Sequence, residues 1–419
     1  MEKLTISFWI FGPFDTGNGV FHDCDARMKE LRERGFNCVR MESCAGLLNA
    51  PDGTPRGDVY LRAPFGRFSS HVRQFNGDRW NGTCNVRERL VAMVRAAKNN
   101  GVKVILSNWY YLHTNWFTSE EINVPLFAMP TEEKIAYFGR ELGAVLSLLR
   151  ENGLLDTVAF AELFNEVDGL PFAGTYKANL PYEEVTHVRG LQEKAIAALK
   201  IDFPEVLFAF DAGTPFCQEE LIPRNADLFS YSCYYLWAVY SLLENECITA
   251  ELTDPDYPPE ARKYMKPESE WITVGDVLAE RALPRTGPDW NRRCAFFENL
   301  DPATFPALEK ALEEALVQNQ DKYFAHLEKD TRRAMYLRDK VLPGKPIVMT
   351  EGATFIYSPY LLFEEHSRTF WDIIARQMQY LKDLGFWGAI CRTNNGPEDP
   401  SWYTNAEDYR RVNAIFLSD

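Results

Sequence analysis

Eight short apolar runs recur along the chain, and helical patterns separate most of them. The helical patterns cover residues 22–34, 86–99, 131–150, 183–199, 216–222, 321–341 and 366–383. Buried strands that alternate with helices predict a parallel sheet, and eight such units predict an α/β fold of the closed (β/α)8 barrel type. The predicted strands are LTISFWIF, FNCVRM, VKVILSN, TVAFAELFN, VLFAFDA, LFSYSCY, PIVMTE and FWGAICRT.

Three glycines mark the passage from a charged helix into an apolar run, at Gly35, Gly101 and Gly385. Glycine readily adopts the left-handed conformation that ends a helix, and a buried strand directly after it is typical of a parallel sheet. An open, doubly wound sheet is the structural alternative. Its dinucleotide-binding form needs a GxGxxG turn after the first strand, and GPFDTGNG matches that pattern poorly.

The length of 419 residues suggests two domains, but barrels of this class often exceed the usual domain size. We therefore expect one domain over residues 1–419. Two segments exceed a minimal barrel: a Gly-, Pro- and Asn-rich loop at 43–84, and a helical insertion at 236–320 between strands six and seven. We expect the insertion to cover part of the barrel mouth. The helical pattern at 306–341 is long enough for one helix or two.

Composition restricts the partners and the compartment. A formal net charge of -15 argues against nucleic acid and anionic membranes, which select basic surfaces. No apolar stretch is long enough to span a bilayer, and the first apolar run lacks a secretion cleavage site. Nine scattered cysteines without a CxxC pair favour reduced thiols in a cytoplasmic protein. The histidines form no HxH or HExxH pattern, so we expect no metal and no cofactor.

Two of the apolar runs end in a glutamate, Glu166 in VAFAELFNEVDG and Glu351 in KPIVMTEGA. The active site of a barrel lies at the carboxyl ends of its strands, and glycosidic bond cleavage requires two carboxyl groups. Retention of configuration needs them ~5–5.5 Å apart, with one protonated and one ionised. Arg40 and Tyr234 also close strands and could hold a carboxylate ionised. Arg40 could instead pair with Glu162 inside the barrel.

Further polar and aromatic residues lie near the strand ends. Asn108 and Arg392 close strands three and eight, and Trp109 and Trp402 lie in loops after strands. Sugar faces stack on aromatic rings, so these two tryptophans are candidate sugar-binding residues, although packing is the more common role for any single one of them. The loops NWYYLHTNW and CYYLWAVY are rich in aromatic residues, and together they favour a sugar-binding site more than any single residue does.

The run ELFNE, which ends at Glu166, resembles the fourth-strand signature of clan A glycoside hydrolases, especially the family 5 cellulase-like enzymes. The resemblance implies that Glu166 is the acid/base and that Asn165 binds the sugar 2-hydroxyl. It implies that Glu351, in PIVMTEGA, is the nucleophile. Arg40 matches the arginine that ends strand two of the family, and Tyr234 matches the tyrosine near the end of strand six.

Several positions depart from the family pattern. Val167 stands where proline usually follows Asn-Glu, and Ser232 stands where a histidine often precedes the tyrosine. The strand-eight tryptophan is replaced by Cys-Arg-Thr, for which Trp402 is a possible substitute. The histidine expected at the end of strand three is represented only by His113, close by. These departures affect the expected substrate more than the expected reaction.

Together these features predict a retaining glycoside hydrolase that cleaves β-linked glycosides or oligosaccharides. The first alternative is a non-catalytic, carbohydrate-binding barrel. The second is a lyase or isomerase that uses Glu166 as a base, which would require a metal or a lysine at a strand end. The sugar, the linkage, endo or exo action and the oligomeric state stay open.

Overall fold

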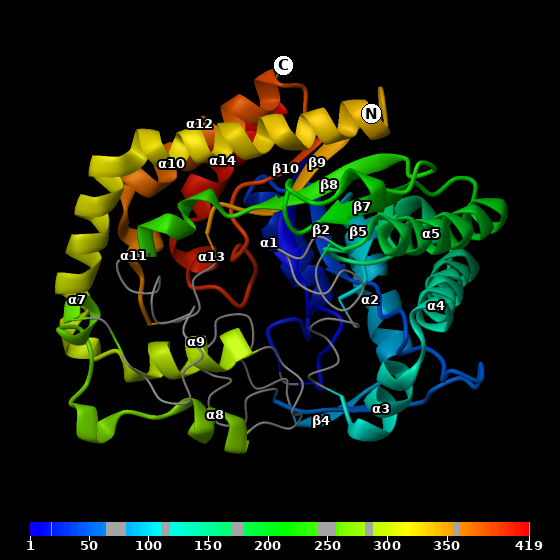
Figure 1. Cartoon of the computed structure of the whole chain (residues 1–419), viewed down its shortest axis with the longest axis horizontal. Coiled ribbons are helices and arrows are strands. Elements are labelled where there is room, and N and C mark those ends of the chain that lie inside the picture. The colour runs from blue at the N-terminus through cyan, green and yellow to red at the C-terminus, as the bar shows by residue number, and fades with distance from the viewer. Residues whose placement is uncertain are drawn as a thin grey trace.

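The computed structural model describes residues 1–17, 19–63, 81–109, 118–168, 180–240, 257, 259–280, 288–354 and 360–418. Eight parallel strands form a closed barrel in the order β1-β2-β5-β6-β7-β8-β9-β10, and β10 pairs with β1 (Figure 1). The predicted (β/α)8 barrel is therefore confirmed. Each predicted run forms one strand: β1 (Leu4–Trp9), β2 (Cys38–Glu42), β5 (Lys103–Ser107), β6 (Val158–Glu162), β7 (Phe208–Ala212), β8 (Leu228–Cys233), β9 (Ile347–Gly352) and β10 (Gly388–Ile390).

Helices surround the strands, and six of the seven predicted helical patterns form α-helices. The prediction at 216–222 is wrong: only the 3₁₀ helix η5 (Glu219–Leu221) forms there, because prolines at 215 and 223 bound the segment. The α-helices are α1 (Cys24–Glu33), α2 (Val86–Asn99), α3 (Glu120–Ala128), α4 (Thr131–Glu151), α5 (Tyr182–Asp202), α7 (Pro259–Arg262), α8 (Val274–Glu280), α9 (Pro288–Asn299), α10 (Phe305–Val341), α11 (Phe363–His366), α12 (Arg368–Asp383), α13 (Ser401–Thr404) and α14 (Ala406–Leu417). The other 3₁₀ helices are η4 (Leu155–Thr157), η6 (Tyr235–Tyr240), η7 (Glu268–Glu270) and η8 (Pro302–Thr304).

Glycine ends three of the helices that lead into barrel strands. Gly35, Gly101 and Gly385 have φ angles of 80°, 65° and 75°, in the left-handed region. The residue after each glycine donates its backbone N–H to the carbonyl five residues earlier, at 2.8–3.2 Å. This hydrogen bond is the mark of the Schellman motif, so the predicted helix–glycine–strand turns are confirmed.

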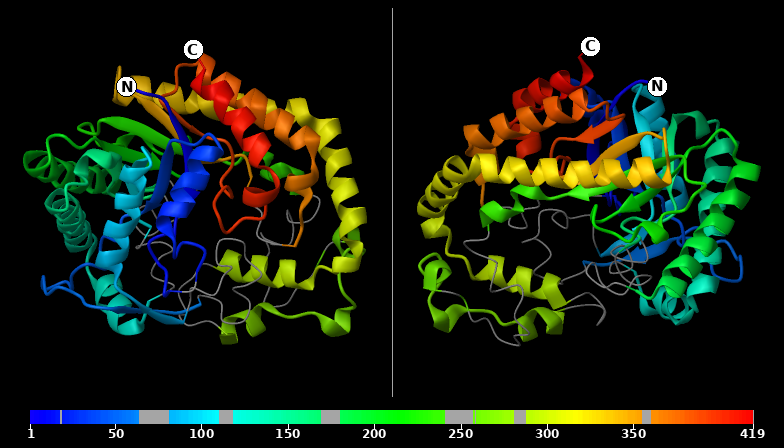
Figure 2. Two further views of the ribbon diagram at one scale, coloured as in Figure 1. Left: turned by 180° about the vertical axis from the view of Figure 1, so that it is seen from behind. Right: turned by 45° about the horizontal axis from the view of Figure 1, so that its top comes forward.

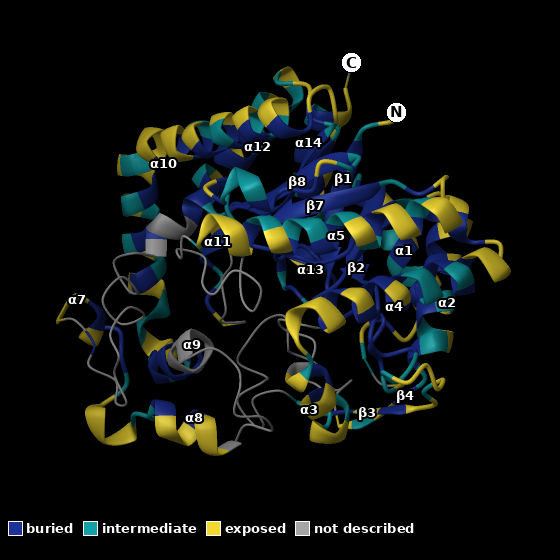
Figure 3. Ribbon diagram, turned by 45° about the vertical axis from the view of Figure 1, so that its right-hand side comes forward, coloured by how far each residue is buried: buried dark blue, intermediate teal, exposed yellow. Residues whose placement is uncertain are grey.

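The core lies between the strands and the inner faces of the helices. Figure 3 shows buried strands in dark blue and exposed residues on the outward faces of α4 and α5. α12 shows the pattern that produces this layer, because its buried Phe370, Ile374, Met378 and Leu381 recur every three or four residues. The barrel is thus a packed scaffold that leaves its strand ends for polar side chains.

The two segments that exceed a minimal barrel both contain regular structure. Residues 43–84 include the antiparallel pair β3 (Val59–Leu61) and β4 (Gly82–Cys84), where the sequence predicts only a loop. Between β8 and β9 the chain forms α7, α8, α9 and then α10, a single helix that bends in Figure 1. In Figures 1 and 2, α8 and α9 lie beyond the strands, on the same side as α3 and β4.

Among the described residues, no helix combines the length and the apolar character needed to cross a bilayer.

Candidate active site

Arg40 lies at the centre of the barrel mouth, with no exposed surface. Its Nη1 donates to Oε1 of Glu351 at 2.5 Å, and its Nη2 donates to Oε2 of Glu162 at 2.6 Å. Nη2 also donates to Oδ1 of Asn165 at 2.8 Å and to Oδ2 of Asp211 at 3.2 Å. The two interpretations of Arg40 are therefore not exclusive, because the guanidinium pairs with Glu162 and with Glu351 at once.

Two aromatic rings lie against the same guanidinium. Cζ of Arg40 is 4.5 Å from the ring centroid of Trp109 and 6.0 Å from that of Phe8. The two rings meet edge to face, with centroids 5.5 Å apart. Trp109 is buried, with 1% of its surface exposed. Its ring makes a cation–π contact with Arg40, and this contact helps to fix the position of the guanidinium.

Glu351 is held by both of its carboxylate oxygens. Oε1 accepts from Arg40, and Oε2 accepts a short hydrogen bond from the hydroxyl of Tyr234. Burial raises the pKa of Glu351, and Arg40 and Tyr234 act in the opposite direction. Burial and the neighbouring Glu351 raise the pKa of Tyr234 well above its usual value, so this hydroxyl stays protonated and donates.

Glu166 lies in the loop that follows β6, and only 7% of its surface is exposed. Its φ of 49° is unusual for a residue other than glycine. Oε1 accepts from Oγ of Ser232 at 3.4 Å, while Ser232 pairs in register with Glu351. The charge of Glu166 also contributes to the raised pKa of Tyr234, the partner of Glu351. The structure therefore brings both glutamates to the end of β8.

The two predicted asparagines lie in the segments that follow β5 and β6. The backbone N–H of Asn165 donates to the carbonyl of Asn108 at 3.0 Å, and Nδ2 of Asn108 donates to the carbonyl of Leu163 at 3.1 Å. Asn108 is fully buried, so its side chain supports the loop that carries Glu166. Within the described residues, Nδ2 of Asn165 has no hydrogen-bond partner. This buried amide group can therefore donate to a ligand.

The structure places two predicted sugar-binding residues in buried clusters elsewhere. Arg392 has no exposed surface, and its guanidinium pairs with Glu364 at 2.6 Å and with Glu365 at 3.4 Å. Two buried carboxyl groups from α11 account for its charge. Its prediction as a substrate ligand is therefore not supported.

Trp402, the suggested replacement for the strand-eight tryptophan, is a core residue. It is 0% exposed, and its ring centroid is 6.0 Å from that of Trp9 and 6.1 Å from that of Phe36. The guanidinium of Arg34 covers it at 4.4 Å. The loop after β10 turns back over α1, which the local sequence does not reveal. His113, the remaining candidate, lies outside the described residues.

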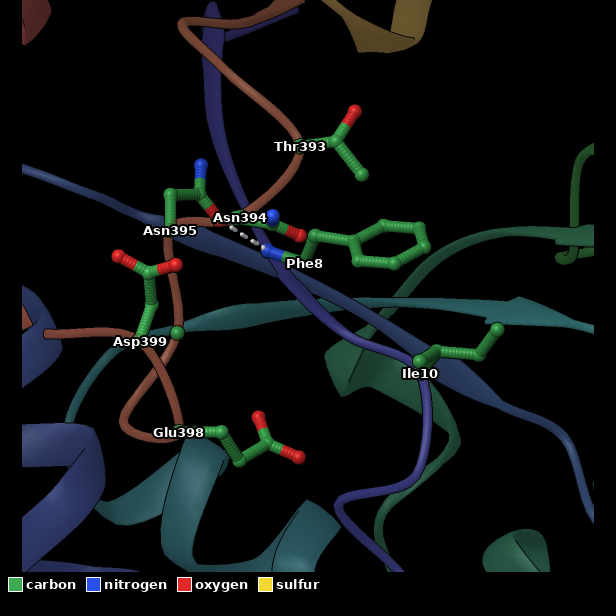
Figure 4. Close-up of a pocket in the computed structure, with 8 residues that line it drawn as sticks. Phe8, Ile10, Thr393, Asn394, Asn395, Glu398 and Asp399 are labelled. Atoms are coloured by element: carbon green, nitrogen blue, oxygen red, sulfur yellow. Dashed lines mark hydrogen bonds between the residues drawn. The ribbon is translucent and has the colours of Figure 1, made fainter. Parts of the chain in front are cut away.

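A pocket opens between the end of β1 and the loop after β10 (Figure 4). Phe8 and Ile10 form its apolar side, and Asn394, Glu398 and Asp399 contribute polar atoms. Oδ1 of Asn395 accepts the backbone N–H of Phe8 at 2.7 Å and ties the loop to β1. Phe8 belongs both to this pocket and to the surroundings of Arg40, whose Cζ lies 6.0 Å from the Phe8 ring centroid.

Three buried acids complete the site. Glu162 faces into the barrel as predicted, and burial raises its pKa to about 7. The sequence marks Asp211 only as one of the polar residues that close apolar runs, without a role of its own, and it does not mark Asp168. Asp168 accepts the backbone N–H groups of Gly213 at 2.6 Å and Thr214 at 3.1 Å, and burial raises its pKa to about 7.

Over the described ranges, no cluster of three or more His, Cys, Asp or Glu side chains is arranged to hold a metal ion.

The fold and the site together define a (β/α)8 barrel of the cellulase-like class. Residues 6–241, more than half of the chain, match the model of a family described as sugar-binding cellulase-like. The chain therefore belongs to the sugar-binding cellulase-like family.

Solved structures share the fold at low sequence identity. A candidate glycoside hydrolase from Parabacteroides distasonis ATCC 8503 is 19% identical, with a TM-score of 0.66 over 99% of this chain and 94% of its own. This likeness shows the fold alone. An endo-1,4-β-mannanase from Eisenia fetida is 13% identical, with a TM-score of 0.43 over 98% of this chain and 91% of its own. No curated protein matches the chain.

Proposed function

We propose that the protein is a retaining glycoside hydrolase acting on β-linked glycosides or oligosaccharides. One observation carries the proposal: both oxygens of Glu351 accept hydrogen bonds, from Arg40 and from Tyr234, while Glu166 meets the same strand end through Ser232. A carboxylate fixed by two donors is suited to nucleophilic attack, and a second carboxyl group nearby is suited to proton transfer.

In the proposed first step, Glu351 attacks the anomeric carbon and Glu166 donates its proton to the leaving oxygen. The bond to the leaving group breaks, and a glycosyl–Glu351 ester forms. In the second step, Glu166 removes a proton from water, the water oxygen attacks the anomeric carbon, and Glu351 leaves as a carboxylate. Arg40 and Tyr234 stabilise the ionised form of Glu351 at the start and end of this cycle.

Asn165 is proposed to bind the 2-hydroxyl of the sugar. Its Oδ1 is committed to Arg40, which directs its Nδ2 away from the guanidinium. A sugar oxygen would satisfy this buried N–H group, and hydrogen bonds to the 2-hydroxyl strengthen in the transition state. The chemistry needs no cofactor, because both proton transfers use groups of the chain.

The test is hydrolysis of aryl β-glycosides (glucoside, galactoside, mannoside, xyloside and cellobioside) by the wild type, Glu351→Gln and Glu166→Gln. We expect Glu351→Gln to lose activity by roughly 10³-fold or more. Glu141→Gln is the matched control, because Glu141 is a buried, hydrogen-bonded glutamate on α4, away from the site. Equal losses in Glu351→Gln and Glu141→Gln would overturn the assignment of the nucleophile.

The stereochemistry of the product tests the mechanism separately. Two displacements at the anomeric carbon preserve its configuration, so the first sugar released from a β-glycoside should be the β-anomer. Proton NMR in the first minutes of the reaction resolves the anomers before they equilibrate. Initial release of the α-anomer would show an inverting enzyme.

Sugar binding without cleavage is the second candidate function. The description of the family as sugar-binding favours it, as do Val167 and Ser232 at the two positions that depart from the hydrolase pattern. In that case no aryl glycoside would be hydrolysed, while one of the free sugars would raise the melting temperature.

A further inference from the structure

Asp211 is the penultimate residue of strand β7 and is fully buried. Its Oδ2 accepts the backbone N–H of Glu166 at 2.9 Å and Nη2 of Arg40 at 3.2 Å. Its Oδ1 accepts the hydroxyls of Ser230 at 2.7 Å and Thr350 at 3.0 Å. One carboxylate therefore receives four donors that come from the β6 loop, β2, β8 and β9.

The bond from the backbone of Glu166 fixes an uncommon conformation. A residue other than glycine at a φ of 49° is strained and persists only where its surroundings hold it. Asp211 accepts a second hydrogen bond from this loop, because its backbone carbonyl accepts the N–H of Val167 at 3.1 Å. Asp168 of the same loop accepts the backbone N–H groups of Gly213 and Thr214, which directly follow β7. These hydrogen bonds hold the loop that carries Glu166 against the end of β7.

The other contacts of Asp211 lead to Glu351. Arg40 donates to Asp211 and to Glu351 from its two terminal nitrogens. Thr350 donates to Asp211 from the position just before Glu351 on β9. Displacement of Asp211 would therefore move the cation that pairs with Glu351 and release the strand that carries it.

We infer that Asp211 is a positioning residue for both glutamates, holding the backbone of Glu166 and fixing Glu351 through Arg40 and Thr350. The catalytic meaning of this inference rests on the proposed function. Its geometric content, that Asp211 maintains the conformation of Glu166, does not depend on that function.

Asp211→Asn separates the charge from the geometry. The amide oxygen can face Glu166 and Arg40, and the amide N–H₂ can face the hydroxyls of Ser230 and Thr350, which are able to accept. Among the described residues, the charged and titratable groups around Glu351 include Arg40 from β2, Tyr234 after β8 and Asp211 from β7, and Glu166 lies at the same strand end. Of these, the charge of Asp211 raises the pKa of Glu351, so its removal lowers that pKa.

The experiment measures kcat and KM against pH for the wild type, Asp211→Asn and Asp211→Ala on the best aryl glycoside. We expect the acidic limb of kcat/KM to move to lower pH in Asp211→Asn, with kcat within about tenfold of wild type. We expect Asp211→Ala to lose roughly 100-fold in kcat with little change in KM, because misplaced groups react slowly after normal binding.

Asp227→Asn is the matched control. Asp227 accepts the backbone N–H of Phe208, at the other end of β7, at 3.0 Å and pairs with Lys200 at 2.6 Å. Its substitution removes a similar aspartate that accepts a backbone N–H, far from the site, and should leave the pH profile unchanged. An unshifted acidic limb in Asp211→Asn, or wild-type kcat in Asp211→Ala, would overturn the inference.

A crystal structure of Asp211→Ala tests the inference if the wild type cleaves no glycoside. That outcome would defeat the proposed function, whereas the inference still requires Glu166 to leave its left-handed conformation in the variant. A Glu166 backbone that superimposes on the wild type would reject it. If Asp211→Ala fails to fold, the structure of Asp211→Asn should retain the conformation of Glu166, and a displaced Glu166 there would count against the inference.

Discussion

At the scale of single residues, the site is a buried group of charges that one guanidinium cannot neutralise. Arg40 faces Glu162, Asp211 and Glu351, all within 3.2 Å of its terminal nitrogens. Removal of charges from water favours protonation, and the pKa of Glu162 is accordingly raised to about 7. At neutral pH the group thus holds a proton on Glu162 for part of the time, which lessens the excess negative charge around Arg40.

The hydroxyl of Tyr234 should control the pH at which the enzyme begins to work. Tyr234→Phe removes a donor to Glu351, and that donor lowers the pKa of the carboxyl group. The pKa should therefore rise, and the acidic limb of kcat/KM should move to higher pH, with a loss of roughly tenfold at the optimum. Tyr231→Phe is the control, because this buried neighbour on β8 bonds Thr331 instead. An identical limb in both variants would reject the prediction.

Removal of Arg40 should destabilise the protein more at high pH. Arg40→Met leaves buried carboxyl groups without their cation, a change that costs about 3–5 kcal/mol. Glu162 has a raised pKa in the folded protein, so its contribution to stability is full below its unfolded pKa and is lost as pH rises towards 7. Loss of Arg40 raises that pKa further. Urea unfolding at pH 5 and pH 8 should show the larger penalty at pH 8, and equal penalties would contradict this account.

At the scale of elements, the glycine turns show how local chemistry defines a helix end. Gly385 has a φ of 75° and an open space around it, so Gly385→Ala suffers from backbone strain and from no clash. We expect a loss of about 1 kcal/mol in the free energy of unfolding. Gly190, inside α5, also has open space but helical backbone, so Gly190→Ala should gain about 0.5–1 kcal/mol. Urea midpoints measure both, and shifts of the same sign would refute the argument.

The parts of the site that the sequence predicts are those fixed by strand order. Apolar runs mark the strands, and the carboxyl ends of parallel strands meet at one edge, so Arg40, Glu166, Tyr234 and Glu351 are found together. Trp402 is misassigned because its position depends on how a loop folds back over α1, a contact between distant parts of the chain. Asp211 is marked as a strand-end residue by its apolar run, but its hydrogen bonds to residues of other strands are contacts between distant parts of the chain and are not predicted.

At the scale of the whole molecule, the segment between β8 and β9 contributes to the barrel wall. The ring of Phe324 on α10 lies 5.6 Å from that of Tyr380 on α12, and Thr331 on α10 bonds the hydroxyl of Tyr231 on β8. We propose that residues 1–419 form one domain. Calorimetry should then show one transition with equal calorimetric and van't Hoff enthalpies, and two resolved transitions would contradict the proposal.

Closure of the barrel by its terminal strands has a consequence for synthesis on the ribosome. β1 pairs with β10, and Ile6 lies opposite Ile390. At about 5–20 residues per second, translation separates these two residues by roughly 20–80 seconds. One edge of β1 therefore stays unpaired until β10 has been synthesised, when almost the entire chain has been made. An unpaired strand edge is a template for aggregation, so this edge is where a nascent chain most needs protection.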